Sequence, residues 1–261
     1  MRTAIGLMVA GIALFAGSAA AHFNMVLPQT ASAKKGEALT FTYQWGHPFE
    51  HQLFDAPQPL SLIVLAPDGK EAELTAQLTR TTRKSGSKEA TAYQLRFTPA
   101  QRGDYVFVLR TPPIWMEEDG EFLQDTVRVT LHVQAQKGWD ATKEDDFELA
   151  PLTRPYGLRP GMVFQAQLHG TGKEAARRGG TLVEIERYNP TAPAMLPPDE
   201  HITRTVKTDP NGVATTTLTE PGWWCLTAAR PHGTRMRDGK AYQLRQRCTL
   251  WVFVDESARD K

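Results

Sequence analysis

The sequence lacks the short motifs that mark the common catalytic sites. It contains no Gly-x-Ser-x-Gly nucleophile motif, no His-Glu-x-x-His zinc motif and no glycine-rich phosphate loop. It also has no excess of one charge, because 30 Lys and Arg residues stand against 29 Asp and Glu residues, and no basic stripe is interleaved with aromatic residues. We therefore expect a binding protein rather than an enzyme, and no nucleic-acid partner.

Long apolar runs are also missing, apart from one at the start of the chain. This run, Ala4–Ala16, follows Arg2 and is too short to remain in a bilayer as a membrane span. The small residues that end at Ala21 are typical of a signal peptidase site, so the sequence predicts a signal peptide over residues 1–21 and export to the periplasm. Cleavage after Ala21 makes His22 the first residue of the mature protein, whereas cleavage after Ala19 places His22 third.

Cysteine is scarce, with two residues in the whole chain, Cys225 and Cys248. Both lie on segments that read as neighbouring strands, and exported proteins usually oxidise paired cysteines. We therefore expect a Cys225–Cys248 disulfide, which would stabilise the fold by about 3 kcal/mol through loop closure. The alternative is that the two thiolates are soft metal ligands.

Sustained helical periodicity is absent, and short alternating apolar runs separated by turn residues take its place. Strands are predicted at Phe23–Pro28, Leu39–Trp45, Leu60–Leu65, Tyr93–Phe97, Tyr105–Leu109, Val127–Val133, Met162–His169, Thr181–Arg187, Val213–Leu218, Trp224–Ala229 and Arg245–Val254. This spacing predicts an all-β protein with two immunoglobulin-like β-sandwich domains in tandem after the signal peptide. The expected boundaries are residues 22–135 for the first domain, 136–160 for a linker and 161–255 for the second domain.

Histidines near the mature N-terminus form the candidate functional site. An N-terminal His22 offers its free α-amine and its imidazole to one metal ion, and imidazole nitrogen suits nickel, cobalt, copper and zinc. His47 and His51 flank Glu50 in a short segment that Gly46 keeps out of a helix, so we place them on a loop after a strand. We expect His22, His47, His51 and Glu50 to bind metal, with Glu117 and Glu118 as the next candidates. The alternative is a solvated loop whose histidines bond backbone carbonyl groups.

Several segments together resemble a known family, the periplasmic components of cobalt and nickel uptake systems of the energy-coupling-factor type. The resemblance covers nearly the whole mature chain and is carried by Ala21-His22, the segment from Gln44 to His51, the segment from Glu184 to Pro190, the segment from Thr208 to Gly212, and the segment from Pro221 to Trp224. It implies a periplasmic protein that holds nickel or cobalt. His22, His47 and His51 are the positions that match the family pattern.

The resulting hypothesis is a periplasmic binding protein that delivers a divalent transition metal, nickel or cobalt, to a membrane uptake system. Two alternatives stay open: a periplasmic copper-binding protein with an N-terminal histidine brace, and a copper-dependent oxidase. Because Cu²⁺ binds most nitrogen sites more tightly than Ni²⁺ or Co²⁺, the sequence does not name the metal.

Overall fold

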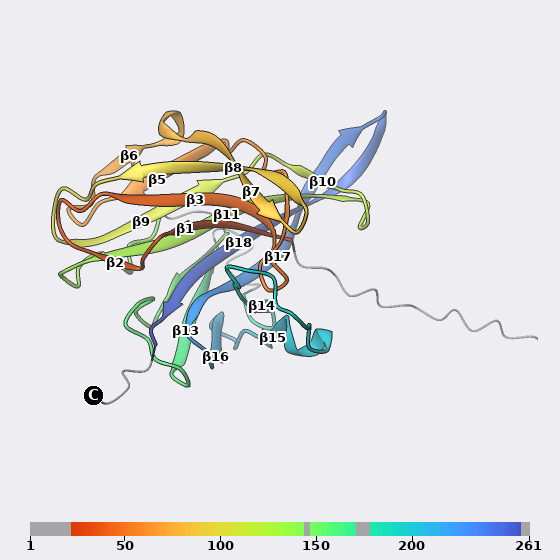
Figure 1. The fold of residues 1–261 in the computed structure, drawn as a ribbon. Helices are drawn as coiled ribbons and strands as arrows, with labels where there is room; N and C mark the ends of the chain where they lie inside the picture. The colour runs from red at the N-terminus through yellow and green to blue at the C-terminus, as the bar shows by residue number, and fades with distance from the viewer. Residues whose placement is uncertain (1–21, 144–146, 171–177, 257–261) are drawn as a thin grey trace, which may run out of the picture.

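A computed structural model describes residues 22–143, 147–170 and 178–256 of the chain (Figure 1). Regular structure in these ranges consists of β-strands and two short 3-10 turns, Thr75–Gln77 and Asp199–His201. The predicted all-β fold of two tandem β-sandwiches is therefore confirmed. No helix within the described ranges is long and apolar enough to cross a membrane. The expected signal peptide, residues 1–21, lies outside the described residues.

The strands form three sheets. The first contains, in spatial order, β1 (Phe23–Pro28), β3 (Leu39–His47), β8 (Lys88–Phe97) and β7 (Thr79–Ser85), with β4 (Gln52–Phe54) on the end of β3. The second contains β15 (Arg204–Lys207), β14 (Leu182–Arg187), β17 (Gly222–Arg237), β18 (Lys240–Val254), β11 (Glu121–Val133), β9 (Gly103–Arg110), β5 (Ser61–Leu65) and β6 (Glu71–Glu73), with β2 (Ser32–Ala33) and β10 (Ile114–Met116) beside β11. The third contains β12 (Phe147–Pro151), β13 (Val163–Gly170) and β16 (Val213–Thr217).

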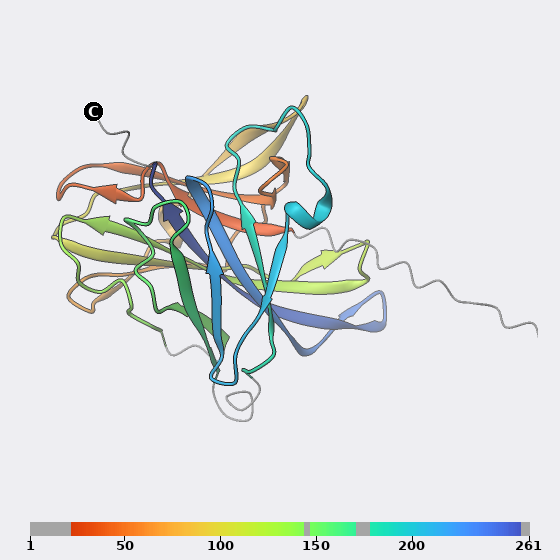
Figure 2. The ribbon, with the colours of Figure 1, turned by 90° about the horizontal axis from the view of Figure 1, so that it is seen from below.

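The second sheet is continuous across both halves of the chain. β11 of the first half pairs in parallel with β18 of the second half, from Phe122 opposite Leu244 to Val129 opposite Trp251. In Figures 1 and 2 the long β17–β18 pair runs through the molecule from one half to the other and ends in a projecting hairpin. The two sandwiches are therefore joined by hydrogen-bonded strands rather than by a covalent connection alone.

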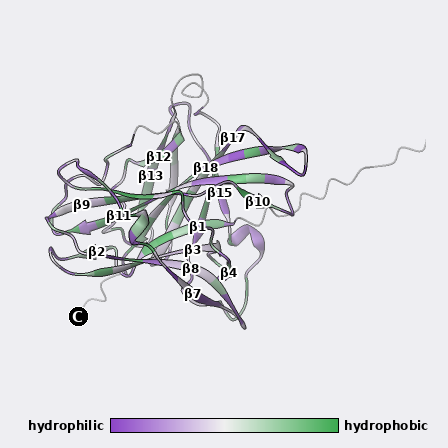
Figure 3. Ribbon diagram, turned by 90° about the horizontal axis from the view of Figure 1, so that it is seen from above, coloured by the Kyte–Doolittle hydropathy of each residue, from purple (hydrophilic) through white to green (hydrophobic). Residues whose placement is uncertain are grey.

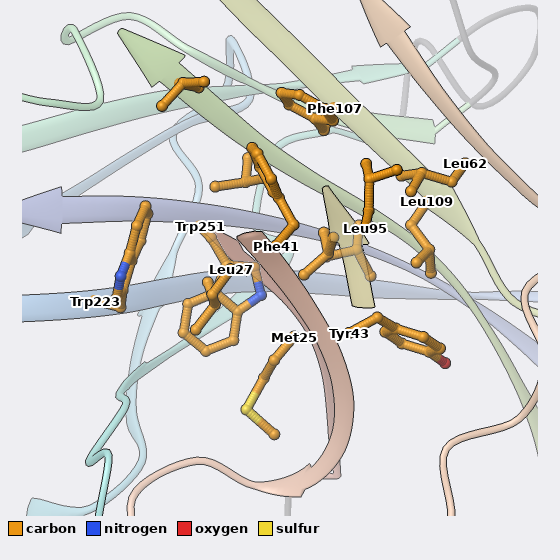
Figure 4. Close-up of a cluster of buried hydrophobic side chains, with 14 of the residues drawn as sticks. Met25, Leu27, Phe41, Tyr43, Leu62, Leu95, Phe107, Leu109, Trp223 and Trp251 are labelled. Atoms are coloured by element: carbon orange, nitrogen blue, oxygen red, sulfur yellow. The ribbon is translucent and has the colours of Figure 1, made fainter. Parts of the chain in front are cut away.

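Alternation along β17 and β18 builds two hydrophobic cores on opposite faces of this sheet. Trp223 and Trp251 face the first core, where they meet side chains such as Met25 of the first sheet (Figure 4). Trp224 follows Trp223 and Leu250 precedes Trp251, and both face the second core beneath β12, β13 and β16. Because both faces are covered, these stretches are mostly apolar, and the buried Thr227 and Thr249 in them bond each other, whereas the projecting tip is hydrophilic (Figure 3).

The cysteines lie on neighbouring strands as expected, but the predicted disulfide is wrong. Cys225 pairs with Trp251 and Cys248 pairs with Ala228, so their positions differ by three residues along β17. An odd offset puts the two side chains on opposite faces of the sheet, Cys225 in the first core and Cys248 in the second. Both thiols are free and buried, and burial raises their pKa, which disfavours the thiolate needed for metal binding.

The segment expected to be a linker contributes to the second sandwich. All five residues of β12 are buried, and this strand forms one edge of the third sheet. The buried Arg128 of β11 forms an ion pair with Glu148 of β12 and donates a hydrogen bond to the carbonyl oxygen of Ala141. The connection between the two halves is therefore shorter than residues 136–160 and is fixed to the first half.

Candidate metal site

Strand register brings His22 and His47 together. β1 and β3 are antiparallel with Phe23 opposite Gly46, so His22, one residue before β1, faces His47 at the end of β3. Directly opposed residues in such a pair share one face of the sheet. The two imidazole rings lie 4.5 Å apart between centroids with their planes at 72°. These are the two side chains that the sequence places first in the candidate site.

Aromatic side chains enclose this histidine pair. Trp45 and Phe54 lie 5.6 and 5.1 Å from the His22 ring, and Phe54 also lies 5.4 Å from the His47 ring, measured between centroids. Burial lowers the pKa of His47, while the carboxylates of Glu50 and Glu118 act in the opposite direction. The neutral imidazole, which is the form that coordinates metal, is therefore favoured at neutral pH.

Two buried polar atoms at this site have no hydrogen-bond partner among the described residues. They are Nε2 of His47 and Oε2 of Glu50. Buried polar atoms are paired in most proteins, and an unpaired one calls for a ligand or solvent. Glu50 follows His47 by three residues, and its carboxylate, like that of Glu118, favours the charged form of His47 and acts against the lowered pKa.

His51 is directed elsewhere. Its Nδ1 lies 2.9 Å from the carbonyl oxygen of Asn189, and its ring lies 6.0 Å from that of Tyr188. Its backbone has a φ of 53°, a left-handed conformation that is uncommon outside glycine. The structure thus separates His51 from the His22–His47 pair, and the described residues contain no group of three or more His, Cys, Asp or Glu side chains arranged for a metal ion.

The loop between His47 and His51 is held by the second half of the chain. Asn189 donates from its backbone N–H to the Pro48 carbonyl at 2.9 Å and from Nδ2 to the Phe49 carbonyl at 2.6 Å. The Phe49 N–H donates to Oε1 of Glu186 at 3.1 Å. Two segments that the sequence analysis treats as separate, one in each half, therefore bind each other.

Glu186 is a buried carboxyl that the sequence analysis does not single out. Burial raises its pKa to about 8, although hydrogen bonds from Thr203 and Phe49 act against the shift. The neighbouring carboxylate of Glu50 raises the pKa further. The sequence gives little signal for this burial, because β14 alternates apolar and acidic residues, with Glu184 and Glu186 on either side of Ile185.

A buried polar network holds the first residue of the described chain. Arg247 of β18 donates to the carbonyl oxygen of His22 and to both carboxylate oxygens of Asp125, at 2.7 and 2.6 Å for the latter two. Asp125 also accepts a hydrogen bond from Asn24 Nδ2 at 2.6 Å, and Tyr43 donates to Asn24 Oδ1 at 2.8 Å. The four side chains of this network, Arg247, Asp125, Asn24 and Tyr43, are all buried, so the start of β1 is fixed in place.

Comparison with solved structures gives only distant likenesses. A DUF4785 family protein from Legionella pneumophila has 12% identity and a TM-score of 0.29, and the match covers 80% of this chain and 52% of that one. Escherichia coli alpha-2-macroglobulin in its native conformation has 12% identity and a TM-score of 0.24 over 90% of this chain and 14% of that one. The chain thus spans about half the length of the first and a small part of the second.

One protein family matches most of the chain. No curated protein matches the chain. Residues 19–231 match the family described as "Domain of unknown function (DUF4198)", and this range includes His22, His47, Glu50, His51 and the Glu186–Asn189 segment that holds their loop. The match extends over more than half of the chain, and the protein therefore belongs to the DUF4198 family.

Proposed function

We propose that the mature protein binds one divalent transition metal ion through His22 and His47 and carries it in the periplasm. The observation that supports this most directly is the opposed His22–His47 pair, in which the buried Nε2 of His47 has no protein partner among the described residues. If cleavage follows Ala21, the α-amine of His22 becomes a third nitrogen donor beside the two imidazoles. The donors present fit a metal ion of this class.

Glu50 is the proposed oxygen donor at the edge of this site. Its Oε2 is buried and unpaired within the described part of the chain, and its charge acts on His47. His51 is not a ligand in this proposal, because its ring lies beside Tyr188 and bonds the backbone of Asn189 and Lys84 rather than facing the His22–His47 pair. Its ring adds one contact to a loop that Asn189 and Glu186 already hold through Pro48 and Phe49.

Nickel and copper suit a site of few nitrogen donors better than cobalt, because tetragonal nitrogen ligation is typical of Ni(II) and Cu(II). Export and the resemblance to cobalt and nickel uptake components support nickel or cobalt as cargo and delivery to a membrane transporter. The alternative is a periplasmic copper-binding protein, and the amine-plus-two-imidazole donor set favours it as the second candidate. A copper-dependent oxidase would use the same donors and is distinguished by turnover.

Metal binding to exported protein tests the proposal. Intact mass fixes the first residue, and metal analysis after dialysis against Ni²⁺, Co²⁺ or Cu²⁺ gives the cargo and its stoichiometry. We expect one metal ion per chain and a loss of affinity greater than about tenfold when one glycine precedes His22 or when His47 is replaced by Ala. Equal affinity in the extended protein would exclude the amine as a ligand, and no binding by the processed protein would exclude the function.

A further inference from the structure

A groove separate from the histidine pair lies between the first sheet and the second half of the chain. It encloses about 670 Å³, within the range of roughly 300–1,000 Å³ that ligand sites occupy. Thr42 of β3 and Gln94 of β8 line one wall, and Tyr188, Trp223 and Phe253 of the second half line the other. The lining includes none of the three residues proposed to bind metal, His22, His47 and Glu50, so the two sites can be tested separately.

Gln44 is a buried amide on the sheet side of this groove with an incomplete set of hydrogen bonds. It is 3% exposed, and its Nε2 donates to the Tyr188 hydroxyl at 3.1 Å. Its Oε1 is buried and has no partner among the described residues. If the amide oxygen and nitrogen of Gln44 were exchanged, the oxygen would gain a partner but the N–H groups would then lack an acceptor. A ligand hydroxyl, which both donates and accepts, satisfies either arrangement.

The wall of the groove on the sheet side offers open backbone groups only at the edge of the sheet. Thr42 of β3 is paired with Leu27 of β1 on one side and with Gln94 of β8 on the other, so β3 has no open edge. β1 is the edge strand and also lines the groove, but its last residue, Pro28, has no N–H to donate. Recognition along β3 and β8 therefore uses side chains. The hydroxyl and amide groups of Thr40, Thr42, Gln44 and Gln94 supply neutral donors and acceptors.

The opposite wall supplies aromatic rings, and the charged side chains that line the groove, Arg83, Arg187 and Glu256, include both signs. Trp223 and Phe253 lie 5.0 Å apart between ring centroids, and Tyr188 lies beside them in the lining. Arg187, at the margin, is engaged by the Glu220 carboxylate at 2.9 Å and the Pro221 carbonyl at 3.1 Å. Aromatic rings facing neutral amides and hydroxyls suit a ligand with apolar ring faces and many hydroxyl groups.

We propose that this groove binds a neutral oligosaccharide. Its sugar rings would pack against Tyr188 and Phe253, and its hydroxyls would bond Gln44, Thr42 and Gln94. The activity is a second binding function of the same exported chain, carried by both halves together.

Titration of chelator-treated mature protein with cellotriose, chitotriose and maltotriose tests this proposal. Calorimetry and the change in intrinsic tryptophan fluorescence are the readouts. We expect saturable binding of at least one trisaccharide, and a loss of at least tenfold in affinity in the Thr42→Val, Gln94→Leu double variant. The matched control is Thr215→Val, Gln165→Leu, which makes the same replacements on exposed positions of the third sheet outside the groove.

Three results would overturn the proposal. The first is no binding of any of the three trisaccharides at millimolar concentration. The second is equal loss of affinity in the groove variant and the control variant. The third is binding of a proline-rich decapeptide with no binding of the sugars, which would make the groove a peptide site. Gln44→Met, which keeps the side-chain volume but removes the amide, gives an independent check and should also weaken sugar binding.

Discussion

Arg247 donates a hydrogen bond from Nη2 to the carbonyl oxygen of His22, a residue 225 positions earlier in the chain. The same guanidinium also donates to both carboxylate oxygens of Asp125, and this pair of bonds fixes its orientation toward β1. The last strand of the second half therefore positions the first residue of the described chain. A metal site built on His22 consequently needs the complete fold, and the first sandwich alone lacks part of its support.

Replacing Arg247 by Met should destabilise the protein and weaken metal binding. The buried carboxylate of Asp125 would lose its charged partner, which typically costs about 3–5 kcal/mol. Urea unfolding measures the stability, and calorimetry with Ni²⁺ or Cu²⁺ at low denaturant measures the affinity. The Arg247→Met, Asp125→Asn double variant is the control and should recover much of the stability but not the affinity, because the His22 carbonyl stays unheld. Recovery of both would show that Arg247 has no positioning role.

The local features of the fold could be predicted from the sequence, and the long-range pairings could not. Alternation and turn residues locate the predicted strands because each signal lies within a few residues. The parallel pairing of β11 with β18 joins segments more than a hundred residues apart, and no local pattern encodes it. The opposition of His22 and His47 depends on the partner chosen by β1, which the sequence analysis leaves open.

The cysteine error lies in the register of the two strands that the sequence analysis places side by side. The β17–β18 hairpin closes with Arg237 opposite Lys240, and carrying this register back without interruption would place Cys248 opposite Ala229. That position is on the same face as Cys225 but four residues along the strand, about 13 Å away, which already exceeds the reach of a disulfide. A register shift between Pro231 and Thr234 moves the partner of Cys248 to Ala228, and the two thiols then point into different cores. A bulge of this kind leaves no clear mark in the sequence.

His47 and His51 should differ sharply in their effect on metal binding. His47→Ala removes a proposed ligand and should abolish tight binding, whereas His51→Gly should leave affinity within about threefold, because glycine accepts the positive φ of position 51 without strain. Since burial lowers the pKa of His47, binding should persist as the pH falls below 6.5. Calorimetric titrations at several pH values measure both effects. Equal losses in the two variants would restore His51 to the metal site.

Both cysteines should titrate as free thiols only after unfolding. The thiols are fully buried in separate cores, so a thiol reagent should find none in the folded protein and two in unreduced protein denatured by guanidinium. Cys225→Ala should reduce stability by about 1 kcal/mol through lost packing and leave metal affinity unchanged. A mass two hydrogens below that of the reduced chain would show that the disulfide forms after all.

Gly46→Ala should disrupt the end of β3 that carries His47. A Cβ at this position would lie 2.0 Å from the carbonyl oxygen of Gln52, so β3 and β4 would have to separate. We expect a loss of stability of about 2 kcal/mol or more and weaker metal binding, measured by urea unfolding and calorimetry. Gly69→Ala is the matched control, because its φ is also positive but the space around its Cβ is open. Similar losses in both variants would trace the effect to backbone strain alone.

Glu186 should make the protein less stable as the pH rises. Its pKa is raised from 4.5 to about 8 in the folded state, so between these values the folded protein keeps a proton that the unfolded chain releases. The stabilising contribution of Glu186 is therefore complete below pH 4.5 and is lost as the pH rises through 8, at a limit of about 1.4 kcal/mol per pH unit. Glu186→Gln mimics the protonated form at every pH and should remove this dependence. Urea unfolding of both proteins from pH 5 to pH 9 gives the difference in stability, which should move steadily in favour of the variant. Parallel curves would show that Glu186 is ionised over the whole pH range. The hydrogen bonds from Phe49 and Thr203 would then be what stabilises its buried negative charge.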